Sequence, residues 1–163
     1  MNINRLIYQL ADKLGSILLK QNLRCAVAES CTGGSLAAAI TDIPGSSQWF
    51  ERGFVTYSNE AKMEMLAVPA VVITSQGAVS EATARAMAEG AIAKSHAEVG
   101  LSITGIAGPG GGSIEKPVGT VWIAWADHLM PTRAQCYLFK GDRATIRQQS
   151  VQVALEGLIQ RCE

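Results

Sequence analysis

The sequence contains no apolar run of the roughly 18 residues that would indicate a membrane span. Its first five residues, MNINR, also lack the uninterrupted apolar stretch of a signal peptide. These absences predict a cytoplasmic protein with no membrane partner.

The sequence also lacks an excess of either charge, because 14 lysines and arginines balance 14 aspartates and glutamates. Proteins that bind nucleic acid usually present a clear positive excess to the phosphate backbone. We therefore expect no nucleic-acid partner. A small phosphorylated ligand, which needs only one or two well-placed cations, remains compatible with this balance.

The sequence also lacks cysteines and histidines at the spacing of a metal site. The four cysteines, Cys25, Cys31, Cys136 and Cys162, are scattered and form no CxxC pair. Neither of the two histidines has a His, Cys or carboxylate cluster near it in the sequence. We expect reduced thiols, no metal site and no cofactor.

What is present indicates one compact domain over residues 1–163. The chain is 48% hydrophobic, includes 16 glycines and shows no repeat or linker. Apolar periodicity predicts helices over 3–18, 36–40, 59–66, 80–92 and from 142 onward, and strands over 25–28, 54–57, 99–103, 120–126 and 134–139. The final helix, capped by Asp142, is expected to bury Ile146, Val153, Leu155, Leu158 and Ile159. The last two strands are expected to form an antiparallel hairpin, so we predict a three-layer α/β/α domain with a mixed sheet.

Ser30 lies where a strand gives way to a glycine-marked helix start. Unpaired backbone amides at such a position can stabilise an oxyanion, so Ser30 is a candidate nucleophile. The amides near residues 31–33 are the expected oxyanion donors, and Thr32, Gly33 and Gly34 are assigned to the substrate site. Two alternatives stay open: Ser30 and Thr32 as simple helix caps, and Cys31 as the nucleophile.

Lys62 is the most credible base for Ser30, because no usable His-Asp pair is near. If Asn59 caps the helix, Lys62 lies in its first turn, where the helix field and burial favour the neutral amine that a general base requires. A solvated surface lysine is the alternative. Tyr57, at the expected strand end, could donate to Lys62, Ser30 or a ligand, or be an ordinary half-buried tyrosine.

The segment 105–112 holds five glycines in eight residues and directly follows a strand. Such a loop lets backbone approach a ligand closely, so Thr104, Gly105, Gly108, Gly110 and Gly111 are candidate substrate contacts. The segment lacks the Gly-Lys-Ser/Thr sequence that ends a Walker phosphate-binding loop. A mobile surface loop, with Thr104 simply closing its strand, is the alternative.

Arg143 follows the expected cap Asp142, at the positive end of the last helix. Acids usually occupy such positions, so an arginine there indicates a phosphate receptor. The alternative is a local ion pair with Asp142 or Asp127.

Six segments together resemble the CinA C-terminal domain family, in the family's order and from the first helix to the last. They are AESCTGG (28–34), VTYSNEAK (55–62), GAVSE (77–81), SITGIAGP (102–109), KPVGTV (116–121) and GDR (141–143). The resemblance is greatest to stand-alone bacterial members that act as nicotinamide-nucleotide amidases. It implies hydrolysis of the carboxamide of nicotinamide mononucleotide (NMN) to nicotinic acid mononucleotide and ammonia, for pyridine nucleotide recycling.

The resemblance also implies residue roles: Ser30 as nucleophile, Lys62 as base, and Tyr57, Thr104 and Arg143 as site-forming. It implies no pyrophosphatase-type activity, which belongs to the extra N-terminal domain of larger members. Two rival functions stay open: a non-catalytic pyridine-nucleotide-binding regulatory module, and an amidohydrolase of another carboxamide. Trp49 and Phe50 are candidates either for a homodimer interface or for the core.

Overall fold

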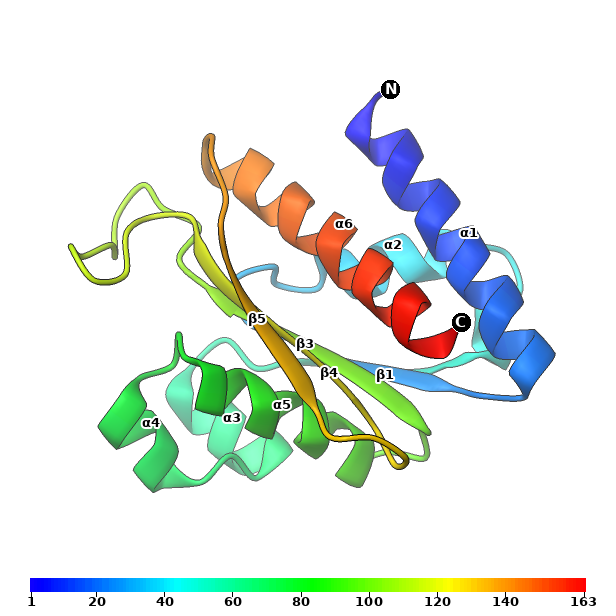
Figure 1. Cartoon of the computed structure of the whole chain (residues 1–163), viewed down its shortest axis with the longest axis horizontal. Helices are drawn as coiled ribbons and strands as arrows, with labels where there is room; N and C mark the ends of the chain where they lie inside the picture. The colour runs from blue at the N-terminus through cyan, green and yellow to red at the C-terminus, as the bar shows by residue number, and fades with distance from the viewer.

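The computed structural model describes residues 1–163 and contains one five-stranded mixed sheet in the order β2-β1-β3-β4-β5 (Figure 1). Strands β2, β1 and β3 are parallel, while β4 runs antiparallel to both β3 and β5. The strands are β1 (Cys25–Glu29), β2 (Phe50–Val55), β3 (Val99–Gly105), β4 (Thr120–Asp127) and β5 (Arg133–Leu138).

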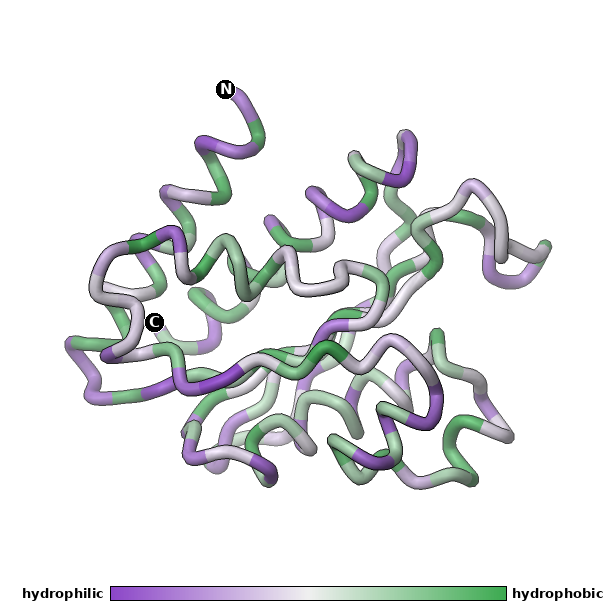
Figure 2. Tube along the Cα trace, turned by 180° about the vertical axis from the view of Figure 1, so that it is seen from behind, coloured by the Kyte–Doolittle hydropathy of each residue, from purple (hydrophilic) through white to green (hydrophobic).

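Helices cover both faces of this sheet, which confirms the predicted three-layer α/β/α architecture (Figure 1). One layer holds α1 (Ile3–Gln21), α2 (Ser35–Thr41) and α6 (Arg143–Cys162). The other holds α3 (Asn59–Leu66), α4 (Ala70–Gln76) and α5 (Glu81–Ala93), and a short 3-10 turn spans Ser46–Gln48. Hydrophilic and hydrophobic residues alternate along α1 in Figure 2, as expected for a helix with one buried face. None of the helices combines the length and the apolar composition that a transmembrane segment requires.

Strand β1 is buried along its whole length, and its side chains alternate between the two helical layers. Cys25 and Val27 pack into the core beneath α1, α2 and α6, whereas Ala26 and Ala28 pack beneath α3 and α5. Continuing this alternation directs Glu29 toward α2 and Ser30 toward α3. The carboxyl ends of β1, β2 and β3 meet at one edge of the sheet, where ligands of open α/β sheets bind.

Helix α6 is fixed to the sheet by Trp125 of β4. The indole Nε1 donates to the carbonyl of Ala154 at 2.9 Å. The indole ring occupies the space that a side chain at Gly157 would need, so only glycine fits at that position. Arg161, near the end of the helix, pairs with Asp127. These contacts fix the middle and the C-terminal part of α6 against the sheet.

Several sequence expectations need correction. Strand β2 ends at Val55, so Tyr57 lies beyond the strand in the connection to α3. Ser58, not Asn59, caps α3, with its hydroxyl accepting from the Ala61 amide at 3.0 Å. Val153 on α6 is only half-buried.

Helix α4 was not predicted, because its Val-Val-Ile-Thr run has the β-branched side chains that favour strands over helices. It forms where it packs against α5. Trp49 is 1% exposed and Phe50 packs against the main core, so neither supports a homodimer interface.

Candidate active site

Ser30 and Lys62 meet at the carboxyl edge of the sheet. The Lys62 Nζ atom lies 3.0 Å from the Ser30 Oγ atom. Only 1% of Lys62 and 8% of Ser30 is exposed. Lys62 is therefore not a solvated surface lysine, and the two side chains form a buried pair.

Three backbone carbonyls complete the surroundings of the Lys62 amine: Thr56 at 2.9 Å, Tyr57 at 3.3 Å and Ser58 at 3.5 Å. Burial lowers the pKa of Lys62 below its ordinary value. A neutral amine can donate its two hydrogens to the carbonyls of Thr56 and Tyr57 and turn its lone pair to the Ser30 hydroxyl. This is the arrangement that a general base requires.

Of the two causes expected for a lowered Lys62 pKa, the helix field and burial, the structure supports burial. The Lys62 amide already donates to the Ser58 carbonyl at 3.2 Å, so the residue lies beyond the unpaired first turn of α3. Burial, which the sequence expectation also named, is the largest cause of the lowered pKa.

Glu29 caps helix α2, and it was missed by sequence reasoning. Its buried carboxylate accepts from the amides of Gly34 at 3.3 Å, Leu36 at 2.9 Å and Ala37 at 3.0 Å. The alternative in which Ser30 and Thr32 cap this helix is therefore wrong. An acid at the end of a fully buried strand, immediately before a helix, was the available signal.

The backbone amides after Ser30 divide into paired and unpaired groups. The Ser30 N–H donates to the Ile103 carbonyl at 2.9 Å, and the Gly33 N–H donates to the Ser30 carbonyl at 3.0 Å. The N–H groups of Cys31 and Thr32 donate to no group of the chain. The candidate oxyanion donors thus narrow to residues 31 and 32, and Gly33 is excluded from that role.

A cavity of about 290 Å³ opens beside the Ser30–Lys62 pair. It brings together nine residues proposed from the sequence: Ser30, Tyr57, Lys62, Thr104, Gly105, Gly108, Gly110, Gly111 and Arg143. It also includes Cys31, Asn59, Val79 and other residues that were not assigned to the substrate site. Thr32, Gly33 and Gly34 do not line this cavity, so the structure does not support Gly33 and Gly34 as substrate contacts. Thr32 keeps a candidate role only through its unpaired N–H, which directly follows Cys31 at the cavity wall.

Arg143 bridges two walls of this cavity. Its Nη1 donates to the Gly108 carbonyl at 2.8 Å, and its Nη2 donates to the Tyr57 hydroxyl oxygen at 3.1 Å. The expected alternative, a pair with Asp142 or Asp127, is wrong, because Asp142 caps α6 through the Thr145 amide and Asp127 pairs with Arg161. Tyr57 is 61% exposed, and its hydroxyl contacts neither Ser30 nor Lys62.

Thr104 and Cys31 occupy buried positions at the cavity wall. The Thr104 hydroxyl donates to the Ala78 carbonyl at 2.8 Å and so ties the end of β3 to the segment before α5. Burial raises the pKa of the Cys31 thiol to about 11. A thiol with that pKa is almost entirely protonated near neutrality, which makes it a poor nucleophile.

Comparisons with known proteins find similar sequences over most of the chain. The sequence profile of the CinA C-terminal domain matches residues 7–162. A CinA-like protein of Akkermansia muciniphila is 54% identical over 142 residues, but the chain spans only 34% of that protein's length. The nicotinamide-nucleotide amidohydrolase PncC of Pseudomonas putida is 50% identical over 156 residues, covering 94% of this chain and 96% of that protein.

Solved structures show the same fold. The competence/damage inducible protein CihA of Agrobacterium tumefaciens superposes with a TM-score of 0.92 at 44% identity, covering 95% of this chain and 94% of that one.

Proposed function

The chain belongs to the CinA C-terminal domain family, and from that premise we propose that it is a nicotinamide-nucleotide amidohydrolase that uses Ser30 and Lys62. The observation that carries the proposal is the 3.0 Å contact between the buried Lys62 amine and the Ser30 hydroxyl, at the wall of a cavity. The PncC relatives of Pseudomonas putida and Escherichia coli, each 50% identical, support the substrate assignment.

The first half-reaction forms an ester. Neutral Lys62 takes the Ser30 proton while Ser30 Oγ attacks the carboxamide carbon of NMN. The unpaired N–H groups of Cys31 and Thr32 are the proposed donors to the resulting oxyanion. As the C–N bond breaks, the Lys62 ammonium returns its proton to the leaving nitrogen, and ammonia departs.

The second half-reaction restores Ser30. A water molecule gives a proton to Lys62 and attacks the ester carbon, and the same oxyanion donors serve again. Collapse breaks the bond to Ser30 Oγ, which recovers its proton from Lys62, and nicotinic acid mononucleotide is released. Lys62 is thus base and acid in turn, which requires a pKa below that of an ordinary lysine.

Arg143 and the glycine-rich loop are the proposed receptor for the nucleotide phosphate and ribose. The N–H groups of Ala107, Gly108, Gly110, Gly111 and Gly112 donate to no group of the chain. All of these residues except Gly112 line the cavity, and together with the Arg143 guanidinium their N–H groups can donate hydrogen bonds to a phosphate monoester. Tyr57 contacts both parts of the site, because its carbonyl accepts from Lys62 and its hydroxyl accepts from Arg143. We assign its exposed ring to packing on the pyridine ring.

A substrate panel tests the proposal. Ammonia release is measured for the purified protein with NMN, nicotinamide riboside, nicotinamide and glutamine, and NMN binding is measured by calorimetry. The proposal predicts that NMN gives the highest kcat/KM. Preference for another carboxamide would assign a different amidohydrolase, and NMN binding without ammonia release would favour the regulatory module.

A further inference from the structure

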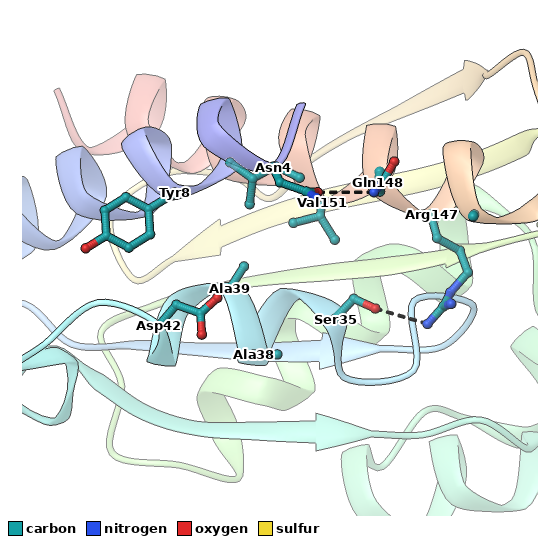
Figure 3. Close-up of a pocket in the computed structure, with 11 residues that line it drawn as sticks. Asn4, Tyr8, Ser35, Ala38, Ala39, Asp42, Arg147, Gln148 and Val151 are labelled. Atoms are coloured by element: carbon teal, nitrogen blue, oxygen red, sulfur yellow. Dashed lines mark hydrogen bonds between the residues drawn. The ribbon is translucent and has the colours of Figure 1, made fainter. Parts of the chain in front are cut away.

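Arg147 lies on α6 one helical turn after Arg143 and holds the loop that follows Ser30. Its Nε donates to the Cys31 carbonyl at 3.1 Å, and its Nη2 donates to the Thr32 carbonyl at 2.9 Å and to the Ser35 hydroxyl at 3.0 Å. Figure 3 shows the side chain extending from α6 to Ser35, at one end of a groove of about 530 Å³ between α1, α2 and α6. Arg147 does not line the cavity beside Ser30.

The two carbonyls that Arg147 binds belong to consecutive peptide groups. In a trans peptide the C=O and N–H bonds point in opposite directions, so the N–H of Thr32 points away from Arg147. The next N–H, of Gly33, is already bonded to the Ser30 carbonyl. A cation that hydrogen-bonds the Cys31 carbonyl withdraws electron density from that peptide, which makes the Thr32 N–H a stronger donor.

We propose that Arg147 is a positioning residue for the oxyanion site, an inference that rests on the proposed function. Arg147 fixes the orientation of the 31–32 peptide group and makes the Thr32 N–H a stronger hydrogen-bond donor. It acts through the backbone and does not touch the substrate. Its effect therefore falls on the transition state, where the oxyanion exists, and leaves ground-state binding of NMN nearly unchanged. Helix α6 then contributes to both ends of the substrate site. Arg143 binds the phosphate in the cavity, and Arg147 orients the peptide group that donates to the oxyanion.

The test compares Arg147→Met, Arg147→Lys and a matched control, Arg161→Met. Arg161 is also on α6, donates to the backbone carbonyls of Met130 and Pro131, and pairs with Asp127 at the end of β4. None of these partners lines the cavity beside Ser30. For Arg147→Met we expect kcat on NMN to fall about 10- to 100-fold with KM changed less than about 3-fold, since loss of a whole oxyanion donor costs about 10²–10³. Arg147→Lys should recover part of kcat, and Arg161→Met should stay within about 2-fold of wild type when assayed well below its melting temperature.

The pH profile separates this role from a change at the base. The midpoint of the rise in kcat with pH reports Lys62 and should be the same in Arg147→Met and wild type. The proposal is overturned if Arg147→Met keeps its kcat, if only KM rises, if the midpoint moves enough to account for the loss, or if Arg161→Met loses as much kcat. If Arg147→Met does not fold, Arg147→Lys decides by the same criteria.

A second substrate keeps this inference separate from the proposed function. p-Nitrophenyl acetate acylates an activated serine through the same kind of oxyanion, so nitrophenol release and an acetyl adduct on Ser30 measure the site without NMN. If wild type acylates but releases no ammonia from NMN, the proposed substrate is wrong and the Arg147 variants are still compared on the ester. Equal acylation rates in wild type and Arg147→Met would overturn the positioning role whatever the substrate.

Discussion

Glu29 and Ser30 are neighbours in the chain but serve opposite faces of the sheet. The Glu29 carboxylate accepts three backbone amides around the start of α2, while the Ser30 hydroxyl contacts the Lys62 amine on the α3 side. The alternation of a strand produces this division. The residue that fixes the start of α2 and the proposed nucleophile are therefore positioned by the same short segment.

Replacing Lys62 by methionine should lower kcat on NMN by about 10²- to 10⁴-fold, the usual contribution of a general base. In wild type, log kcat/KM should rise with pH by about one per unit and level off below pH 10.5, because burial lowers the Lys62 pKa from that value. The sign follows from the role: protonation removes the lone pair that accepts the Ser30 proton. Lys62→Arg should show no such rise, since its guanidinium stays protonated. A Lys62→Met enzyme with undiminished kcat would contradict the base assignment.

Replacing Glu29 by alanine should lower the free energy of unfolding by about 3 kcal/mol, because three amide donors lose a charged acceptor in a buried site. Glu29→Gln keeps one acceptor oxygen and should lose less. Urea unfolding monitored by circular dichroism measures both. Exposed Glu64 on α3 is the control, and Glu64→Ala should stay within about 0.5 kcal/mol of wild type. Equal losses for Glu29→Ala and Glu64→Ala would show that the cap is not stabilising.

Replacing Arg143 by methionine should raise the KM for NMN by about 10- to 100-fold, in keeping with the loss of charge-assisted hydrogen bonds to a phosphate. Nicotinamide riboside, which lacks the phosphate, should be affected much less, so the preference for NMN over the riboside should collapse. Tyr57→Phe is the matched control, because it removes the Arg143–Tyr57 hydrogen bond but keeps the charge. Equal effects of Arg143→Met on both substrates would exclude phosphate binding by this residue.

Replacing Cys31 by alanine should leave kcat within about 3-fold of wild type, because a buried thiol with a pKa of about 11 supplies little thiolate. Ammonia release and alkylation by iodoacetamide are measured on the same preparations. Loss of all activity in Cys31→Ala, with an unchanged melting temperature, would make Cys31 the nucleophile.

Much of the fold could be predicted from the sequence because its periodicity is strong. Strands such as Cys25–Glu29 are continuously apolar up to their last residue, and α1 has one clear buried face. Helix α4 could not be predicted, since its β-branched run favours a strand until packing against α5 is known. Local propensity does not include that contact.

Some features of the candidate site could likewise be predicted from the sequence, and others could not. Ser30 and Arg143 stand out by their type and their positions at element ends, and Lys62 stands out as a base for Ser30; the structure brings all three to one cavity. The partners of Arg143 could not be read from the sequence, because Gly108 and Tyr57 approach it only through the sheet topology. The only sequence feature that could have indicated a role for Arg147 is its position one helical turn after Arg143. Its backbone partners could not be predicted, because they lie more than a hundred positions earlier in the chain.

Ammonia release from NMN by wild type, Ser30→Ala and Cys31→Ala, measured side by side, decides whether Ser30 is the nucleophile. We expect release by wild type and Cys31→Ala, and a loss of at least about 10³-fold in Ser30→Ala, because removing a nucleophile abolishes the acyl-enzyme route. Undiminished release by Ser30→Ala would exclude Ser30 as the nucleophile and place that role on another residue.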